Sequence, residues 1–291
     1  MIATTGFFDG VHCGHRLVAE RLVSEAKSRG DGSLVVTFWP HPRAVLQDGA
    51  RELRLLTTLD EKKALLQGLG VDRIEVLDFT RPFAALTAEQ YLRDILQARF
   101  GVTTLVMGYD NRLGSDHLTA SSLKSIAERY GMELIEVEAL SASPDNPVSS
   151  TKIRNALTEG RVEEAAAMLG YHYELNGAVV AGNRLGRTIG FPTANLQLYE
   201  PLKLIPGNGV YAVEADVLGR TYRAMTNIGT RPTVGGSVRT IETHILDFDE
   251  DIYGLPLRVR FLRRIRDEVR FPSLEALRQQ LTKDRDACRQ D

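Results

Sequence analysis

The sequence has 291 residues, of which 43% are hydrophobic and 25% are charged, so it is long enough for two packed domains and is neither disordered nor fibrous. Its 36 basic and 38 acidic side chains leave a formal net charge of -2, without the basic excess that general nucleic-acid binding requires. No apolar run approaches the ~20 residues needed to span a bilayer and no secretory signal is visible, so we expect a cytoplasmic protein without nucleic-acid or membrane partners.

The first half of the chain alternates short apolar runs with amphipathic stretches, which is typical of a parallel sheet covered by helices. Five runs are predicted to be strands: Ile2–Thr5, Leu34–Phe38, Ile74–Phe79, Thr104–Gly108 and Leu134–Val137. Two helix starts have the spacing of a capping box, Thr58 with Glu61 and Thr87 with Gln90. A last helical stretch runs from about Ser150 to Leu169 and ends at Gly170. We therefore expect an α/β domain over residues 1–169.

The pattern changes after Tyr173 to short β-type runs separated by Gly, Pro, Asn and Asp. These runs are Ala178–Ala181, Val210–Val217, Tyr222–Asn227, Thr240–Leu246 and Leu257–Leu262. Their spacing predicts a small antiparallel barrel over residues 170–291. Ser273 precedes an apolar stripe through Leu277 and Leu281, which predicts one closing helix.

The segment Gly6–His15, GFFDGVHCGH, follows the first strand and leads into a helix. Gly6 and Gly14 permit a tight turn, so free backbone N–H groups at the helix start can face an anion. His12 and His15 could then donate hydrogen bonds to the oxygens of a reacting phosphorus centre.

Other interpretations of this segment stay open. The histidines could contribute to a zinc site, although no third ligand is evident in the sequence, or they could be purely structural. Asp9 could coordinate Mg²⁺ or cap the turn. Cys13 and Cys288, at opposite ends of the chain, are expected to be free thiols.

A second cluster lies at Val148–Arg154, VSSTKIR, where a helix begins. The hydroxyls of Ser150 and Thr151, the backbone donors and Arg154 one turn later could hold the phosphates of ATP. Taken alone, the segment could equally be a capped helix with a solvated arginine.

In the second half, Gly182–Asn195 reads GNRLGRTIGFPTAN and could cradle phosphates through backbone N–H groups near Gly182, Gly186 and Arg187. Thr193 and Asn195 offer hard oxygen ligands suited to Mg²⁺. Glu242 lies in a β-branched run, where a carboxylate is either an outward-facing strand residue or a general base.

Four segments in order, GFFDGVHCGH, FWPHPR, GYDNRLG and VSSTKIR, resemble successive motifs of the bacterial bifunctional riboflavin kinase/FAD synthetase family. The resemblance implies a Rossmann-like nucleotidylyltransferase domain that joins FMN to the AMP part of ATP and releases pyrophosphate. It implies that His12 and His15 grip phosphates. Ser150, Thr151 and Arg154 would complete the ATP site, and Asp110 would contact a phosphate of the flavin or of ATP. Leu113 stands where the family usually has an aromatic residue.

The segments GFPTAN, NIGTRPT, ETHILDFDEDIYG and IRDEVRFPSLEAL resemble the flavokinase module of the same family. The resemblance implies that Thr193 and Asn195 bind Mg-ATP and that Glu242 accepts the proton of the ribityl 5′-hydroxyl of riboflavin. Arg266 would help to hold the flavin or the nucleotide. His244 could tune Glu242 or serve only in the structure.

These motifs together predict a bifunctional enzyme that uses Mg²⁺ and ATP to convert riboflavin to FMN and FMN to FAD. We expect a monomer or a weak homo-oligomer. One alternative is a single-function nucleotidylyltransferase with an accessory barrel, which would not phosphorylate riboflavin. Another is a non-catalytic flavin-binding module, which would bind flavin without consuming ATP.

Overall fold

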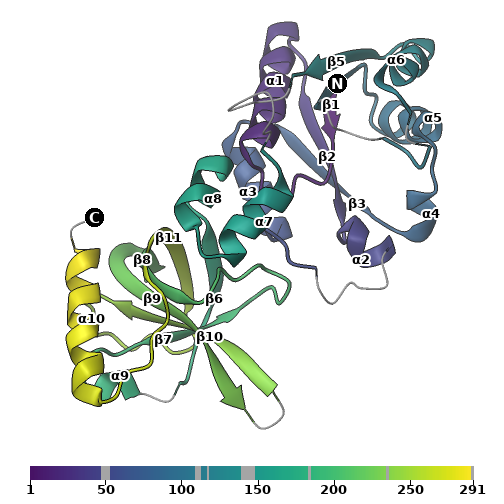
Figure 1. Cartoon of the computed structure of the whole chain (residues 1–291). Helices are drawn as coiled ribbons and strands as arrows, with labels where there is room; N and C mark the ends of the chain where they lie inside the picture. The colour runs from purple at the N-terminus through teal and green to yellow at the C-terminus, as the bar shows by residue number, and fades with distance from the viewer. Residues whose placement is uncertain are drawn as a thin grey trace. The chain divides into compact units, whose positions relative to one another are not determined.

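The computed structural model describes residues 1–46, 53–108, 113–116, 118–138, 148–182, 185–233 and 236–289. The chain divides into two compact units, Met1–Ser150 and Thr151–Asp291, whose elements are shown in Figure 1. Within the described residues, neither Cys13, which is half-buried, nor Cys288, which is buried, forms a disulfide. Within the described ranges, no helix combines the length and the apolar character needed to cross a membrane.

The first unit is built on a parallel sheet of five strands in the order β3-β2-β1-β4-β5. The strands are β1 (Ile2–Thr5), β2 (Ser33–Trp39), β3 (Arg73–Asp78), β4 (Thr104–Gly108) and β5 (Glu133–Val137). Every residue of β1 is buried, because it is the central strand of a sheet with helices on both faces. All five strands predicted from apolar runs are confirmed, and so is the α/β class.

Helices cover both faces of this sheet (Figure 1). One face packs against α1 (Cys13–Arg29) and α3 (Leu59–Gly68). The other packs against the π-helix η2 (Tyr91–Arg99) and α6 (Ala120–Arg129). The connections carry three short helices, α2 (Pro42–Leu46), α4 (Arg81–Ala84) and α5 (Ala88–Gln90).

Both predicted capping boxes are present in the first unit. At the start of α3, Thr58 Oγ1 accepts a hydrogen bond from Glu61 N (3.2 Å), and Glu61 Oε2 accepts one from Thr58 N (2.9 Å). Thr87 and Gln90 make the same reciprocal pair at the start of α5. Each box pairs two backbone donors that the helix itself cannot pair, so these helix starts could be located from sequence.

The stretch predicted to be helical from about Ser150 to Leu169 forms two helices, α7 (Ser150–Thr158) and α8 (Val162–Leu169). Gly160 lies between them with φ of 77°, a left-handed conformation that ends a helix and that glycine adopts without strain. A Cβ on Gly160 would lie 2.6 Å from the Tyr211 hydroxyl, so a side chain would not fit there either. Gly170 caps α8 in the left-handed conformation, as predicted.

Hydrogen bonds join this helical pair to the strands that follow it. The backbone N–H of Gly207 donates to the carbonyl of Leu157 (2.8 Å). The guanidinium of Arg264 donates to the carbonyls of Glu159 (3.2 Å) and Asn208 (2.7 Å). Since α8 also packs on β11, the helical pair is part of the second unit by packing.

The second unit is centred on a closed antiparallel barrel with the strand order β10-β7-β6-β11-β8-β9. Its strands are β6 (Glu174–Val180), β7 (Ala194–Leu198), β8 (Gly209–Val217), β9 (Arg220–Thr233), β10 (Gly236–Ile245) and β11 (Pro256–Arg266). The predicted barrel is confirmed. The sequence predicted five of these strands and missed β7, because Asn195 and Gln197 interrupt its apolar pattern.

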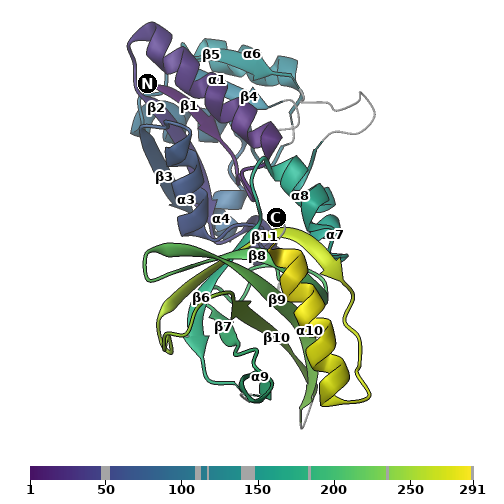
Figure 2. The ribbon, with the colours of Figure 1, turned by 90° about the vertical axis from the view of Figure 1, so that its left-hand side faces the viewer.

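The predicted closing helix is α10 (Leu274–Cys288). Ser273 Oγ accepts a hydrogen bond from Ala276 N (3.1 Å) and so caps the helix. The helix lies along β8 and β9 of the barrel (Figure 2). Leu281 and Cys288 belong to its apolar contact with the barrel wall. The short helix α9 (Leu185–Thr188) precedes β7.

Candidate active sites

The segment Gly6–His15, which we call the histidine turn, connects the carboxyl end of β1 to α1. The neighbours of β1 are β2 on one side and β4 on the other, so the chain reverses its direction of travel across the sheet at this strand. In open α/β sheets, ligands bind in the crevice beyond the carboxyl ends of the strands at this kind of reversal. The histidine turn therefore lies where the topology favours a binding site.

The two predicted histidines lie against each other at the start of α1. His12 is the residue that caps the helix, and its Nδ1 accepts a hydrogen bond from His15 N (3.4 Å). Their rings are stacked, with centroids 3.7 Å apart and an interplanar angle of 17°. A Cβ on Gly14 would lie 3.3 Å from the ring of His12, so the glycine leaves space for this arrangement. Both imidazoles thus lie at a helix start, where backbone N–H groups can also bind an anion.

The backbone of the histidine turn is strained and is held by side chains. Phe8 (φ 52°) and Val11 (φ 36°) are non-glycine residues in the left-handed region, which costs on the order of 1–3 kcal/mol each. Buried Asp9 compensates, because its Oδ1 accepts hydrogen bonds from the backbone N–H groups of Leu56 (3.0 Å) and Thr57 (3.1 Å). Asp9 therefore anchors the turn to the segment before α3, which is the capping role considered from sequence.

Burial holds the pKa of the His15 imidazole well below its usual range, and the nearby His12 and Lys62 act in the same direction. His15 is consequently neutral at neutral pH and can donate only one ring N–H. Its Nδ1 is buried and has no hydrogen-bond partner among the residues that the structure describes. A polar atom of this kind is a position at which a substrate group or a water can bind.

The VSSTKIR segment reaches the histidine turn through Ser150, whose Oγ donates to the carbonyl of Asp9 (2.9 Å). Thr151 and Arg154 follow on the first turns of α7 and belong to the second unit. Asp110 lies outside the described residues. Leu113 is buried in the apolar cluster of η2 and α6, where it fills the core.

The predicted barrel residues come together on neighbouring strands. Glu242 on β10 is directly opposite Asn195 on β7 and Asn227 on β9. Directly opposed residues of antiparallel strands point to the same face, with Cβ atoms about 5 Å apart. The hydroxyl of Thr193, just before β7, donates to Glu242 Oε2 at 3.5 Å. A carboxylate, two amides and a hydroxyl therefore form one polar group on the barrel wall.

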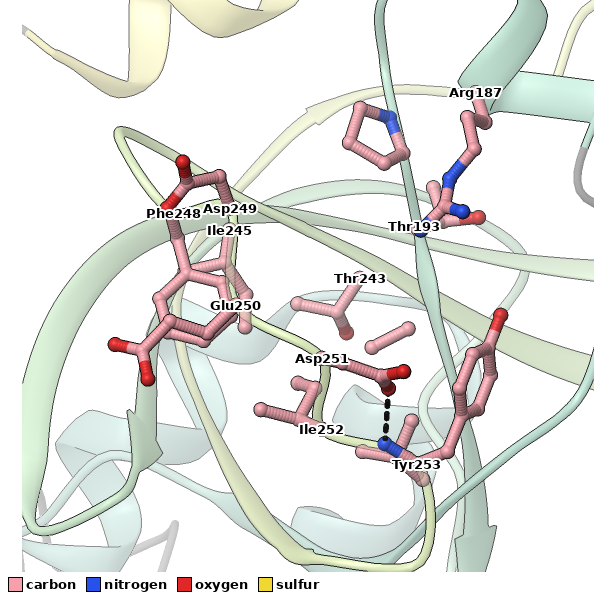
Figure 3. Close-up of a pocket in the computed structure, with 13 residues that line it drawn as sticks. Arg187, Thr193, Thr243, Ile245, Phe248, Asp249, Glu250, Asp251, Ile252 and Tyr253 are labelled. Atoms are coloured by element: carbon pink, nitrogen blue, oxygen red, sulfur yellow. Dashed lines mark hydrogen bonds between the residues drawn. The ribbon is translucent and has the colours of Figure 1, made fainter.

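Two pockets adjoin this polar group and share Thr193. The Glu242 pocket has an apolar wall that includes Met225, Phe271, Leu277 and Leu281, and a polar part that includes Glu242, Asn227, His244, Arg266 and Glu268. The Arg187 pocket is lined by Arg187, Phe248, Tyr253 and the acidic residues 249–251. Figure 3 shows Arg187 and Thr193 on one side of this pocket and Asp249 and Glu250 on the other. Thr193 therefore lies at the border between the two pockets.

The glycines of the predicted phosphate loop make room for neighbouring groups. A Cβ on Gly182 would lie 2.2 Å from Asn195 Nδ2, and one on Gly186 would lie 2.2 Å from the Phe191 carbonyl oxygen. Residues 183–184 of this loop lie outside the described residues. Among the residues that are described, no three His, Cys, Asp or Glu side chains are grouped to hold a metal ion.

Comparison with known proteins decides the family. A family model described as FAD synthetase matches residues 1–152, and one described as riboflavin kinase matches residues 169–291. The chain is 38% identical to the bifunctional riboflavin kinase/FMN adenylyltransferase of Escherichia coli K12 and 37% identical to that of Listeria monocytogenes, in each case over 97% of this chain and 90% of the relative. The chain belongs to the bifunctional riboflavin kinase/FMN adenylyltransferase family.

The fold of this family member is also found in a solved structure. A crystal structure described as a macrolide-efflux protein from Streptococcus pneumoniae is 35% identical and has a TM-score of 0.92, over 99% of this chain and 93% of that one. Both catalytic modules of the bifunctional family are present, so the chain is an enzyme with riboflavin kinase and FMN adenylyltransferase activities. ATP, riboflavin, FMN and FAD are its substrates and products.

Other residues of this bifunctional enzyme support the Glu242 pocket. Arg266 lies in its wall, and the guanidinium donates through Nε and Nη2 to the buried carboxylate of Asp284 (2.8–3.1 Å). His244 Nδ1 lies 2.8 Å from the carbonyl oxygen of Pro192, and the pKa of its imidazole is lowered by burial. Sequence reasoning missed Asn227 and Asp284. Only the register of β9 against β10 and the packing of α10 identify them.

Proposed function

We propose that each unit supplies the centre of one reaction: the histidine turn transfers AMP from ATP to FMN, and the Glu242 pocket transfers the γ-phosphoryl group of ATP to riboflavin. The observation that carries this assignment is the grouping of Glu242, Thr193 and Asn195. Glu242 and Asn195 are 47 residues apart in sequence but lie directly opposite each other on β10 and β7, and the Thr193 hydroxyl bonds to Glu242. The stacked His12 and His15 at the start of α1 support the other half.

In the kinase reaction, the flat ring system of riboflavin occupies the Glu242 pocket against its apolar wall, and ATP occupies the Arg187 pocket. Arg187 binds the ATP phosphates as a charged donor. Thr193 borders both pockets, so the phosphoryl group passes beside it. Glu242 takes the proton of the ribityl 5′-hydroxyl as that oxygen attacks the γ-phosphorus, because an alcohol is a poor nucleophile until a base removes its proton. ADP is the leaving group.

A magnesium ion fits the donors beside Glu242. The hydroxyl of Thr193 and the amide oxygen of Asn195 are hard oxygen ligands, which Mg²⁺ prefers. Thr193 and Asn195 would hold the ion together with the ATP phosphates. When bound, it would offset negative charge on those phosphates. Gly182 contributes by leaving space for the Asn195 side chain, and Gly186 by leaving space for the carbonyl that precedes the Thr193 segment. Arg266 shapes the flavin side of the pocket.

In adenylyl transfer, an oxygen of the FMN phosphate attacks the α-phosphorus of ATP and pyrophosphate leaves. His12 and His15 donate hydrogen bonds to phosphate oxygens, His15 as a neutral imidazole, together with N–H groups of the α1 start. Gly6 and Gly14 keep the turn tight, and Asp9 holds its conformation. Ser150, Thr151, Arg154 and Asp110 complete the phosphate site, as the family resemblance implies.

The functional division assigns residues 1–169 to adenylyl transfer and residues 170–291 to the kinase. This division counts α7 with adenylyl transfer because the VSSTKIR motif lies at its start. By packing, α7 belongs to the same compact unit as the barrel. A cytoplasmic monomer or weak homo-oligomer without a nucleic-acid partner remains part of the proposal.

The test is to incubate the purified protein with riboflavin, Mg²⁺ and ATP and to separate FMN and FAD by chromatography. Glu242→Gln should abolish FMN formation but still convert supplied FMN to FAD. His15→Ala should still form FMN but not FAD. If either substitution stopped both reactions in folded protein, the assignment of one reaction to each site would be wrong. If both variants kept both activities, neither residue would have its proposed role.

A further inference from the structure

Lys62 on α3 is a buried cation directly behind the histidine turn. Its side chain is 1% exposed, and Nζ donates to the carbonyl of Phe7 (2.8 Å) and to Thr37 Oγ1 (3.1 Å). The ammonium also lies 4.0 Å from the centroid of the Phe7 ring. In the described part of the chain, no carboxylate is within ion-pair distance of Nζ. A buried ammonium without an ion pair costs stability, so its contacts call for a functional explanation.

Lys62 contacts the histidine turn at Phe7, near its start. The Phe7 carbonyl accepts a second hydrogen bond, from Thr37 Oγ1 (3.3 Å), and is therefore fixed by both α3 and β2. Two residues later, Asp9 is bonded to Leu56 and Thr57. The strained turn is thus held at Phe7 and at Asp9, and both attachments involve residues 56–62.

Lys62 also acts on the histidines through its charge. His12 and Lys62 are the charged or titratable groups that influence His15, and both disfavour its protonation. Asp9 faces Lys62 and favours the charged ammonium, while burial opposes it. A positive charge behind the turn therefore favours the neutral form of His15 and attracts phosphate groups in front of it.

We propose that Lys62 is a positioning residue for adenylyl transfer: its ammonium fixes the Phe7 carbonyl that leads into the histidine turn and supplies the positive charge behind His12 and His15. This inference rests on the proposed function of the turn. Lys62 does not touch the substrates, because its side chain is enclosed. It acts through the backbone of Phe7 and through the protonation state of His15.

The test compares Lys62→Met, which keeps length without charge, and Lys62→Arg, which keeps charge with altered shape. Conversion of supplied FMN to FAD is measured for kcat and KM from about pH 5 to about pH 9, a range that covers histidine titration. In Lys62→Met, we expect kcat to fall about tenfold to 100-fold, since a small misplacement of reacting groups has effects of this size. The acid limb of the profile should move to higher pH, because His15 protonates more easily. Lys62→Arg should keep the acid limb of the unmodified enzyme even if its kcat falls.

Controls separate this inference from misfolding and from the proposed function. Lys63→Met makes the same change on the neighbouring, half-buried lysine and should leave the profile unchanged. Fluorescence of Trp39, the sole tryptophan of the sequence, reports whether the first unit is folded. If Lys62→Met does not fold, the pH profile of Lys62→Arg tests the inference instead. An acid limb that moves in Lys62→Arg contradicts the inference. An unchanged pH profile in folded Lys62→Met overturns the inference about Lys62. In that case the proposed function of the histidine turn would still stand if His15→Ala formed no FAD. An active His15→Ala would overturn the function itself.

Discussion

The two proposed active sites each bring together side chains suited to phosphate chemistry, but they do so by different structural means. In the first unit the histidines lie on a connection between a strand and a helix, with Phe8 and Val11 in strained conformations. That connection is held by the side chain of Asp9, which accepts hydrogen bonds from the backbone of Leu56 and Thr57, and by the side chain of Lys62 on α3. In the barrel, Glu242 and Asn195 lie on regular strands, and the backbone register alone places them opposite each other. A site on a loop therefore needs supporting side chains, whereas a site on a sheet needs mainly space.

The largest effect that would sharpen this comparison is expected from Gly182→Ala. The new Cβ would displace the Asn195 amide, which would otherwise be 2.2 Å away. The amide is the far end of a side chain and can move at little cost, so the unfolding temperature should change little. Riboflavin phosphorylation should fall about 100-fold, because a proposed ligand leaves its place. Kinase and adenylyl transfer assays on the same preparation measure both.

Gly68→Ala is a suitable control, since a Cβ at Gly68 meets open space. It should alter neither activity. If Gly182→Ala phosphorylated riboflavin at the rate of the unmodified enzyme, space beside Asn195 would not be what the barrel site requires.

A smaller effect is expected from Asp9→Asn in the histidine turn. The neutral amide accepts the Leu56 and Thr57 hydrogen bonds less strongly, which should destabilise the first unit by about 1–3 kcal/mol. Adenylyl transfer should fall about tenfold as the turn loosens, and the kinase should be unaffected. Denaturant unfolding followed by Trp39 fluorescence measures the stability. Asp60→Asn, on an exposed aspartate of α3, should change neither quantity, and equal losses in the two variants would refute the anchoring role of Asp9.

The smallest effect is expected in the pH dependence of folding stability, which measures how far burial of Lys62 destabilises the protein. Burial lowers the pKa of the Lys62 ammonium to about 8 from its usual 10.5. Between these values the unfolded chain binds the proton more tightly than the folded one, so folding stability rises with pH in that window. From about pH 7 to about pH 9, the unmodified protein should gain about 1 kcal/mol relative to Lys62→Met. The measurement is unfolding of the first unit at each pH. If the stabilities of the unmodified protein and of Lys62→Met changed in parallel with pH, burial would not destabilise the charged form of Lys62.

The sequence predicted most of the scaffold, because its local signals agree with the fold. The five strands of the sheet are continuous apolar runs, and Thr58 and Thr87 mark their helices through reciprocal caps. The helix ending at Gly170 and the one beginning after Ser273 were also predicted. The interruption at Gly160 was missed, since one glycine in a helical pattern does not by itself indicate a turn.

The supporting residues of the sites could not be predicted as readily. Lys62 follows Asp60 and Glu61 and precedes Lys63, so it resembles a solvated helix residue. Its spacing of four from buried Leu66 was the available signal. Asn227 and Asp284 depend on register and helix packing, which no local pattern determines. By contrast, His12, His15 and Glu242 occur in motifs, and motifs can be recognised before the fold is known.

The bonds of Arg264 and Gly207 to the α7–α8 turn bear on how the enzyme can be divided. A fragment that begins after α8 would leave those donors without their acceptors and would strip the barrel of a packed element. A fragment that begins at α7 would keep the barrel whole, but it would also contain Thr151 and Arg154, which we propose for the adenylyl transfer site. If Thr151 and Arg154 serve adenylyl transfer as proposed, no single cut between Ser150 and Gly170 would leave both activities intact.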